Sequence, residues 1–357
     1  MEKRYQRHIQ IPEIGTAGQK KLAEARVLVV GAGGLGCPVL QYLSSSGVGC
    51  IGIVDPDTVE TSNLARQILY CDADVSKNKA ICAMNKLTHL NPDTSLKAYP
   101  VTLTHENALE LINQYDIVVD GTDNFSTRYL ISDSCVLLNK VMVYGGLYKY
   151  EGQVGVFNYN GGPTYRCLFP TQPQLGEIPD CSETGTLSVV PGVIGLLQAT
   201  EVLKIILGLG DLLSGKLLCL DLMSYEQRFF HFKKNKAEIQ RVIQNKAPLA
   251  NKFTDCVLDF EVTLNSLSKK DEIQWIDVRE QDEEPKINIK STTSLPGGKG
   301  LELTKIKVQD SKKILFCKSG VRSKSILQQW KSQGIKNCFY LKEGAEALNK
   351  WYKTDEG

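Results

Sequence analysis

Short apolar runs alternate with amphipathic stretches over the first 160 residues of the chain. The β-branched runs predict strands at Val27–Val30, Cys50–Val54, Ile117–Asp120 and Val141–Gly145, with an extended piece near Lys97–Val101. Helix-like patterns separate most of these runs, an order that is typical of a parallel sheet with helices on both faces. We therefore expect an α/β fold built on a doubly wound sheet.

The pattern changes after residue 150. Gly152–Tyr159 predicts an added strand, so we expect a mixed sheet. Gly161–Thr186 is rich in Pro, Gly and Cys and predicts a long loop, a kind of segment that often carries function. Pro191 and Gly192 then open a strong helix over Val193–Leu207.

Apolar periodicity fades over Lys233–Asn251, where Lys, Asn and Gln dominate, and this indicates a linker. A smaller α/β unit follows, with strands predicted at Ile273–Val278, Lys313–Cys317 and Cys338–Leu341 and a helix from Ser323 to about Gln333. The predicted divisions are a first domain at 1–240, a linker at 241–256 and a second domain at 257–357.

Composition narrows the class of protein. A length of 357 residues with 42% hydrophobic residues suits two domains, and a net charge of +2 favours neither nucleic acid nor a membrane surface as the main partner. No apolar run reaches the roughly 20 residues that span a bilayer, and the start lacks the apolar core of a signal peptide. We expect a cytoplasmic protein, in which the 11 cysteines are free thiols.

The stretch after the first strand predicts a nucleotide site. Val27–Val30 runs into Gly31-Ala32-Gly33-Gly34-Leu35-Gly36 and then into a helix pattern. Glycines allow the backbone to approach a phosphate at the positive end of the following helix. An acid after the second strand, Asp55 or Asp57, can hold a ribose hydroxyl. The motif alone leaves NAD, FAD and ATP open.

Polar residues farther along favour phosphate chemistry. They are Asn63, Arg66, Gln67, Lys79, Asp123 and Asn124. Because ligands of open α/β sheets bind at the carboxyl ends of the strands, Asp55, Arg66 and Asp123 should converge on one crevice. Cations beside a phosphate, with a carboxylate for Mg²⁺, suit phosphate transfer and are not needed for hydride transfer.

Each charged residue also has a purely structural interpretation. Arg66 could form a surface ion pair, and Lys79 could lie on a solvated helix face. Asp123 could cap the helix that begins at Asn124 or Phe125. Their common order and spacing favour the nucleotide site.

Residues 4–230 resemble the MoeB/ThiF/HesA family, relatives of the ubiquitin-activating enzymes. The matching pieces are RYQRHI, GAGGLGCPVLQYL, GIVDPDTVETSNLARQ, DGTDNF, YEGQVGVF, YRCLFP and VVPGVIGLLQATEVLK. The resemblance implies a Rossmann-like fold that uses ATP and Mg²⁺ to adenylate the C-terminal Gly-Gly carboxylate of a ubiquitin-like sulfur carrier protein. Pyrophosphate is the implied by-product.

The resemblance also implies roles for residues of this chain. The glycines line the nucleotide loop, Asp55 binds the ribose, and Asp123 holds Mg²⁺. The implied phosphate contacts are Asn63, Arg66 and Lys79. Arg7 matches an arginine that reaches the neighbouring active site of a homodimer, and Cys181 matches a cysteine of a mobile crossover loop that takes up the activated carrier or forms a persulfide-derived linkage.

One departure from the family concerns zinc. Family members hold a structural zinc with two Cys-x-x-Cys pairs, whereas no two cysteines of this chain have that spacing. Thr164 stands where the first ligand belongs, with Cys167 alone, and Lys233-Lys234-Asn235-Lys236 and its neighbours replace the second pair. We expect no zinc, and packing in its place.

A second thiol site is predicted in the smaller unit. The strand at Lys313–Cys317 leads into a short loop and a helix, where backbone N–H groups and Arg322 would stabilise a thiolate or persulfide at Cys317. With Asp277-Val278-Arg279-Glu280 upstream, residues 257–357 resemble a rhodanese-type sulfurtransferase domain, and the Cys-x₄-Arg loop favours sulfur over phosphate. The His-Ile-Pro-Gly-Ala stretch typical of that family is missing.

The sequence is therefore interpreted as a fused adenylyltransferase and sulfurtransferase. Cys317 would deliver persulfide sulfur from a donor such as a cysteine desulfurase, so that the carrier ends in a thiocarboxylate. The fusion favours molybdopterin biosynthesis, with thiamine synthesis and tRNA thiolation as alternatives. Two rival hypotheses are an NAD-dependent oxidoreductase and a binding module that holds the carrier without activating it.

Overall fold

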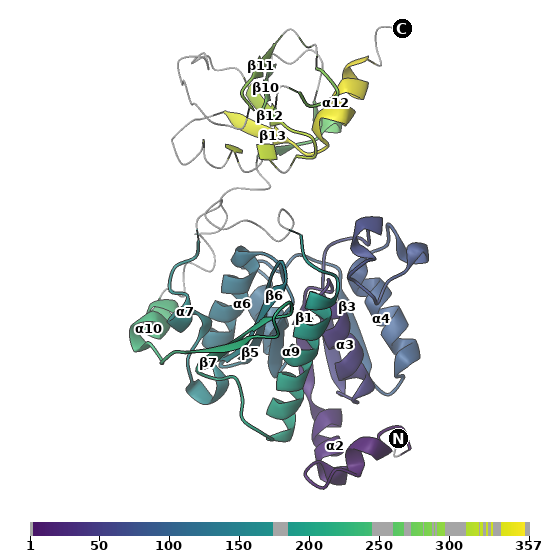
Figure 1. Cartoon of the computed structure of the whole chain (residues 1–357), viewed down its shortest axis with the longest axis vertical. Helices are drawn as coiled ribbons and strands as arrows, with labels where there is room; N and C mark the ends of the chain where they lie inside the picture. Colours follow the sequence, from purple (N-terminus) through teal and green to yellow (C-terminus); the bar gives the residue numbers. More distant parts are fainter. Residues whose placement is uncertain are drawn as a thin grey trace. The chain divides into compact units, whose positions relative to one another are not determined.

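The protein comprises two compact units, Met1–Asn251 and Lys252–Gly357, and the predicted linker spans their junction. The computed structural model (Figure 1) describes residues 3–173, 185–244, 260–267, 273–280, 282–287, 289, 291–296, 312–320, 322–323, 326–327, 330 and 337–353.

The first unit is built on an eight-stranded sheet with the order β3-β2-β1-β4-β5-β6-β7-β8. The first five of these strands are mutually parallel, and each of β6, β7 and β8 pairs antiparallel with the strand before it, so the predicted mixed sheet is confirmed. The strands are β1 (Arg26–Val30), β2 (Cys50–Val54), β3 (Ser95–Tyr99), β4 (Ile117–Asp120), β5 (Val141–Tyr148), β6 (Glu151–Phe157), β7 (Lys216–Asp221) and β8 (Gln227–His231).

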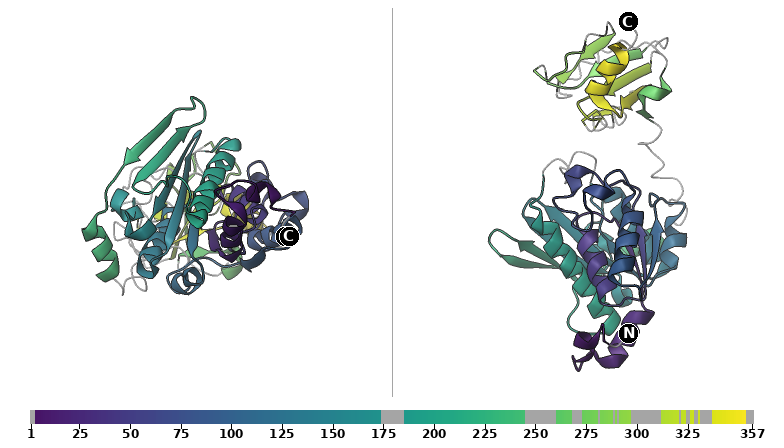
Figure 2. Two further views of the ribbon diagram at one scale, coloured as in Figure 1. Left: turned by 90° about the horizontal axis from the view of Figure 1, so that it is seen from below. Right: turned by 90° about the vertical axis from the view of Figure 1, so that its right-hand side faces the viewer.

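Helices cover both faces of this sheet (Figures 1 and 2). Alternate strand residues point to opposite faces: Val27 and Val29 belong to one apolar core, and Leu28 and Val30 to the other. The helices are α1 (Gln6–Ile9), α2 (Gly15–Glu24), α3 (Gly36–Ser45), α4 (Lys79–Leu90), α5 (Ala108–Asn113), α6 (Phe125–Leu138), α7 (Tyr165–Leu168), α9 (Val189–Leu207) and α10 (Lys236–Gln244), with short 3₁₀ turns η1 (Thr61–Asn63), η2 (Asp72–Asp74) and η3 (Tyr159–Gly161). Residues of α3, α4 and α9 pack in the first core, and residues of α5 and α6 in the second.

Helix α10 differs from the sequence-based prediction. The sequence predicts a linker from residue 233, but residues 236–244 are helical. Asn235 begins the helix, because its Oδ1 accepts hydrogen bonds from the backbone N–H groups of Ala237 (3.1 Å) and Glu238 (3.4 Å). Val242 is its buried residue. Ile239, Val242 and Ile243 have helical spacing, so the periodic signal is present in the sequence and is outweighed by the polar composition of the segment.

Helix α9 begins at Val189, four residues before the predicted start. Pro191 is compatible with this because the first turn of a helix does not use its N–H groups. The helix is long and apolar enough, by length and composition alone, to cross a bilayer. It instead packs against α3, β5 and β6, where Val190, Ile194 and Val202 are fully buried.

The second unit contains a parallel five-stranded sheet with the order β11-β10-β12-β13-β9. Its elements are β9 (Glu261–Val262), η5 (Leu264–Ser266), β10 (Ile273–Asp277), β11 (Thr292–Ser294), β12 (Lys312–Phe316), β13 (Cys338–Leu341) and α12 (Gly344–Lys353). The three predicted strands are confirmed, and the described residues of the helix predicted from Ser323 are helical.

Candidate functional site

The carboxyl ends of β1, β2 and β4 meet at one edge of the first sheet. Val30 pairs with both Val54 and Asp120, so the residues that follow these three strands lie side by side. The backbone N–H of Gly31 donates to the carbonyl of Val54, and that of Gly121 to the carbonyl of Val30, each at 2.8 Å. The strand ends that precede Asp55 and Asp123 are therefore adjacent, and the convergence of Asp55, Arg66 and Asp123 on one crevice stays a prediction.

The four glycines of the loop have different constraints. Gly31 has φ +92°, and a Cβ there would lie 2.6 Å from the carbonyl oxygen of Gly121. A Cβ on Gly36 would lie 2.0 Å from the carbonyl oxygen of Gly31. A Cβ on Gly34 would lie 3.0 Å from its nearest neighbour, a side-chain atom of Pro191. A Cβ on Gly33 would have no neighbouring atom closer than 3.6 Å. Gly31 and Gly36 are thus required by the fold, and Gly33 leaves space on the loop surface for a ligand.

Asp55 ties the glycine loop to the end of β2. It is 5% exposed, and its carboxylate accepts hydrogen bonds from the backbone N–H groups of Ala32 (2.7 Å) and Asp57 (2.9 Å). Burial raises the pKa of Asp55, and Lys79 and the two N–H groups offset only part of this effect. Each carboxylate oxygen retains a second lone pair that can accept a hydrogen bond from a ribose hydroxyl.

Lys79 is buried at the start of α4, so it does not lie on a solvated helix face. Its side chain is 8% exposed and its ammonium lies 3.2 Å from Oδ2 of Asp57. The preceding residue, Asn78, caps α4 by accepting from the N–H of Ile81. The Nδ2 group of Asn78 donates to the carbonyls of both Asp55 and Asp57 at 3.1 Å. Sequence analysis missed Asn78, although an Asn before a helix is a recognised signal.

Residues of η1 and the turn after it face the glycine loop. Asn63 and Gln67 are 7% and 4% exposed, and the side-chain carbonyl oxygen of each lacks a hydrogen-bond partner. Gln67 is the residue nearest to the open position at Gly33. Arg66 donates to the carbonyl of Ser62 at 3.0 Å, and within the described residues it forms no ion pair. Buried polar atoms without partners are uncommon, which is consistent with a polar ligand here.

The loop after β4 leaves Asp123 available. Asn124, not Asp123, caps α6, since its Oδ1 accepts from the N–H of Thr127 at 2.9 Å. Asp123 is exposed, and in the described part of the chain its carboxylate has no hydrogen-bond or ion-pair partner. A free carboxylate at the carboxyl end of a strand is a suitable Mg²⁺ ligand.

A buried ion pair stabilises the loop after β4. Arg128 Nε lies 2.9 Å from Oδ2 of Asp120, with side chains that are 9% and 0% exposed. Arg128 also donates to the carbonyl of Thr122, and Asp120 accepts from the N–H of Thr122, both at 3.0 Å. Gln198 of α9 donates to the carbonyl of Asp120 at 2.8 Å. Sequence analysis missed Arg128 and Gln198, because only the fold brings them to the loop.

One predicted site residue, Arg7, is not part of this edge. Helix α1 packs near the amino ends of the strands, where Arg4 donates to the carbonyl of Leu90 and the Tyr5 hydroxyl accepts from Asn91. Arg7 of α1 is exposed and lies two residues after Tyr5, near these amino ends. Cys181 lies outside the described residues.

The backbone and the polar groups of this edge fit a nucleotide. The backbone of Gly31–Gly36 lies at the start of α3, which has no side-chain cap, so its N–H groups can bind a phosphate. Lys79 supplies a cation, and the unpartnered side-chain carbonyl oxygens of buried Asn63 and Gln67 can accept hydrogen bonds from a donor such as a ribose hydroxyl. The N–H groups and the cation fit the triphosphate of ATP, with Asp123 as the group that would hold Mg²⁺.

In the second unit, Cys317 follows β12 and is 1% exposed. The Ser323 hydroxyl donates to its sulfur at 3.5 Å and lies 2.9 Å from the carbonyl of Gly320. Gly320 has φ +81°, and a Cβ there would meet the carbonyl of Lys342 at 2.6 Å. Sequence analysis predicted the cysteine and the short loop but missed Ser323.

Arg322 is bound by a carboxylate from the neighbouring strand connection. Its two terminal nitrogens each lie 2.6 Å from an oxygen of Glu283, and these hydrogen bonds lower the pKa of Glu283 to about 2. A cavity of about 590 Å³ opens beside this pair. It is lined by Asp277, Arg279, Glu280, Glu283, Lys286, Ile287, Ile289, Thr292 and Ser294. The proposed effect of Arg322 on the Cys317 thiolate therefore involves a guanidinium whose charge is already partly neutralised.

Comparison with known families decides the class of the first unit. The model of the ThiF family matches residues 5–241. The chain belongs to the ThiF family. The model of the rhodanese-like domain matches residues 262–350. This ThiF-family chain is therefore an enzyme that combines an adenylyltransferase domain with a rhodanese-like domain.

Relatives of this ThiF-family chain match all or part of its length. The probable adenylyltransferase/sulfurtransferase MoeZ of Mycobacterium tuberculosis is 37% identical over 99% of this chain and 94% of its own length. A sulfur carrier protein adenylyltransferase of Thermus thermophilus is 49% identical over 65% of this chain and 88% of its own. A probable molybdopterin-synthase adenylyltransferase of Porphyra purpurea is 39% identical over 90% and 86%.

Solved structures support the fold. A structure of E. coli MccB with ATP has a TM-score of 0.57 at 24% identity and covers 65% of this chain and 72% of its own. At that identity the likeness concerns the fold alone.

Proposed function

We propose that this enzyme uses ATP to adenylate the C-terminal glycine of a ubiquitin-like sulfur carrier protein and then converts it to a thiocarboxylate with sulfur from a Cys317 persulfide. The observation that carries the first step is the sheet edge that bears the glycine loop, buried Lys79 and the unpaired carboxylate of Asp123. Relatives named as sulfur carrier adenylyltransferase and as adenylyltransferase/sulfurtransferase support the same reaction.

In the adenylation step, a carboxylate oxygen of the carrier attacks the α-phosphorus of ATP and pyrophosphate leaves. Two anions must approach one another, so cations that offset their charge lower the barrier. We assign this role to Lys79 and Arg66, with Asn63 and Gln67 as polar contacts to the phosphates. Asp55 holds the ribose hydroxyl, Asp57 positions Lys79, and Asn124 fixes the loop. Mg²⁺ held by Asp123 would add positive charge at the phosphates.

In the sulfur-transfer step, the terminal sulfur of the Cys317 persulfide attacks the carbonyl carbon of the acyl-adenylate, and AMP leaves. The product is an acyl disulfide on Cys317. A second thiol must then attack the Cys317 sulfur, which releases the thiocarboxylate and leaves a disulfide. Cys181 is the candidate for this thiol. Ser323 and Arg322 would stabilise the negative charge of the persulfide.

Partners and pathway follow from this reaction. The name of the Porphyra relative favours molybdopterin biosynthesis, with thiamine synthesis and tRNA thiolation as alternatives. The persulfide would come from a donor such as a cysteine desulfurase. A homodimer is proposed because the resemblance implies that Arg7, which is exposed on α1, reaches the active site of a second copy. Nine described cysteines are free, which suits a cytoplasmic enzyme.

The two steps can be tested separately with a Gly-Gly-ending carrier. The wild type should catalyse carrier-dependent exchange of pyrophosphate into ATP and, with a persulfide donor, replace one carboxylate oxygen of the carrier by sulfur, as detected by mass spectrometry. Cys317→Ser should keep the exchange and lose the thiocarboxylate. Cys338→Ser, at the buried end of β13, is the control. If Cys317→Ser still yields thiocarboxylate, Cys317 is not the sulfur donor.

A further inference from the structure

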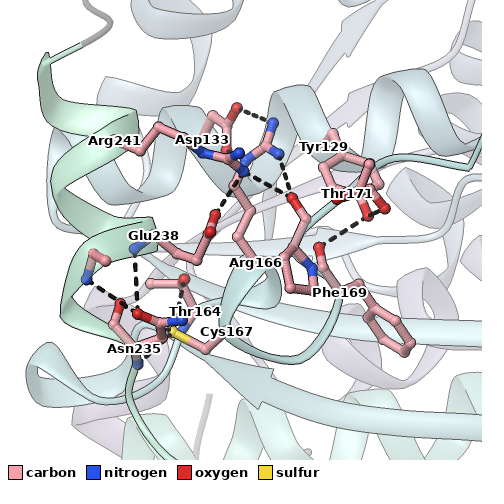
Figure 3. Close-up of polar contacts among 12 residues, drawn as sticks. Tyr129, Asp133, Thr164, Arg166, Cys167, Phe169, Thr171, Asn235, Glu238 and Arg241 are labelled. Carbon is pink, nitrogen blue, oxygen red and sulfur yellow. Dashed lines mark hydrogen bonds and ion pairs between the residues drawn. The ribbon is translucent and has the colours of Figure 1, made fainter.

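Helix α10 and the segment 169–171 meet α6 and α7 at the position where zinc would be expected (Figure 3). A structural zinc site requires four N or S ligands. Among the described residues, no group of three or more His, Cys, Asp and Glu side chains is placed to hold a metal ion. The residues present at this position therefore do not fit zinc.

The sulfur of Cys167 has hydrogen-bond partners instead of a metal. The backbone N–H groups of Thr164 and Asn235 donate to it at 3.3 and 3.2 Å, and the Thr164 hydroxyl lies at 3.3 Å. Asn235 is the residue that caps α10. The thiol thus joins the start of α7 to the start of α10.

Two arginines complete the connection (Figure 3). Arg166 of α7 binds Asp133 of α6 through Nε (2.6 Å) and Nη2 (2.8 Å), and these bonds raise the pKa of Arg166 although burial opposes its charge. Nη2 of Arg241, in α10, lies 2.5 Å from Oε2 of Glu238. Both arginines donate to the same carbonyl oxygen, that of Pro170, at 3.2 and 2.8 Å.

The backbone carbonyls on either side of Pro170 contact the Tyr129 hydroxyl. The Tyr129 hydroxyl of α6 lies 2.9 Å from the carbonyl oxygen of Phe169 and 2.8 Å from that of Thr171. The guanidinium of Arg166 lies over the Tyr129 ring, 4.7 Å from its centroid. The Tyr129 hydroxyl has one proton, which the carbonyls of Phe169 and Thr171 share, and the two arginines donate to the carbonyl between them. Side chains from three helices therefore contact three consecutive carbonyls.

We propose that these residues form a metal-independent clamp that replaces the zinc site of the family. The clamp consists of Tyr129, Asp133, Thr164, Arg166, Cys167, Asn235, Glu238 and Arg241. Its two cations face two carboxylates, so the cluster is charge-balanced, and it fixes α10 and residues 169–171 to α6 and α7. The clamp makes the stability of the first unit independent of zinc, whether or not the proposed sulfur-carrier chemistry is correct.

Metal content and chelation test whether the first unit is stable without zinc. Full-length protein that is expressed with zinc in the medium should contain far less than one zinc per chain. Its thermal unfolding midpoint, followed by circular dichroism, should be unchanged by a strong zinc chelator. One zinc per chain together with a lower midpoint after chelation would overturn the proposal, and neither measurement depends on enzymatic activity.

Arginine variants test whether the side-chain contacts of the clamp stabilise the first unit. Arg241→Met should lower the unfolding midpoint of the first unit by about 3 °C, and Arg166→Met by more, since Arg166 is 13% exposed and its loss leaves Asp133 without its partner. Arg228→Met is the matched control, because Arg228 (57% exposed) is about as exposed as Arg241 (47% exposed) and pairs with Glu226, but among the described residues its guanidinium donates to no carbonyl.

Amide hydrogen exchange separates a local clamp from general destabilisation. Arg241→Met should accelerate exchange in peptides that cover 165–171 and 236–244 while leaving the strand peptides of β1 and β4 protected. Equal effects of Arg241→Met and Arg228→Met, or uniform acceleration across the unit, would refute the clamp. All three tryptophans, Trp275, Trp330 and Trp351, lie in the second unit, so unchanged tryptophan fluorescence serves as an internal control.

Discussion

Lys79 is bound twice to Asp57: its ammonium lies 3.2 Å from the carboxylate and its backbone N–H donates to the carbonyl at 2.9 Å. The lysine side chain is 8% exposed, whereas that of Asp57 is 67% exposed. A buried cation is therefore held beside the glycine loop by an acid at the surface. The arrangement provides positive charge for a phosphate while the ammonium remains paired in the free enzyme.

We predict that Lys79→Ala lowers the rate of carrier-dependent pyrophosphate exchange about 10²- to 10³-fold, because it removes a preorganised cation from the reacting phosphate. The measurement is kcat for exchange at saturating ATP and carrier. Lys77→Ala, an exposed lysine two residues earlier, should leave the rate unchanged. A wild-type rate in Lys79→Ala would remove Lys79 from the mechanism.

The glycine loop offers a contrast between two alanine substitutions. Gly36→Ala places a methyl group 2.0 Å from a backbone oxygen and should destabilise the first unit by about 1–3 kcal/mol. Gly33→Ala meets its nearest atom at 3.6 Å and should change stability by less than about 0.5 kcal/mol. Urea unfolding followed by circular dichroism compares them. Equal losses would show that the loop geometry is described wrongly.

The buried pair of Asp120 and Arg128 should be sensitive to loss of one partner. Arg128→Met leaves a fully buried carboxylate without its cation, and we expect a loss of about 3–5 kcal/mol in the free energy of unfolding. Lys20→Ala breaks an ion pair whose lysine is 77% exposed and should cost less than about 1 kcal/mol. A loss in Arg128→Met as small as that in Lys20→Ala would contradict the support assigned to the loop.

The sequence predicts the parts of the site that are continuous along the chain. Strand β1, the glycines and the acid after β2 follow one another, and each has a local physical reason. Asp120 and Arg128 are separated by only eight residues but pair because Arg128 turns inward on α6. Arg322 and Glu283 are 39 residues apart, and only the adjacent strands of the second sheet bring them together. Such pairs cannot be deduced from residue spacing alone.

Acid should weaken the second unit through Glu283. Arg322 lowers the pKa of Glu283 from an ordinary 4.5 to about 2, so the folded state binds this proton less readily than the unfolded state. The stabilisation is complete above about pH 4.5 and is lost as the pH falls through about 2. Because the side chains of Arg322 and Glu283 are both partly exposed, the contribution of this pair to the free energy of unfolding is limited.

Tryptophan fluorescence measures this effect in the full chain, because all three tryptophans lie in the second unit. Urea unfolding between pH 5 and pH 2, an interval set by that pKa shift, should show a smaller loss of stability in Glu283→Gln than in the wild type. Glu346→Gln, which alters an exposed pair with Lys350, is the control. An identical pH dependence in Glu283→Gln and the wild type would mean that the pair contributes nothing.

The central claim is that the carboxyl edge of the first sheet adenylates a Gly-Gly carrier, and Asp123→Ala tests it most directly. In an ATP–pyrophosphate exchange assay with Mg²⁺, exchange by the wild type should depend on the carrier, and Asp93→Ala, which alters an exposed acid elsewhere, should match it. Asp123→Ala should lower exchange about 100-fold or more while its unfolding midpoint stays unchanged. No carrier-dependent exchange in the wild type, or full exchange in Asp123→Ala, would contradict the assignment.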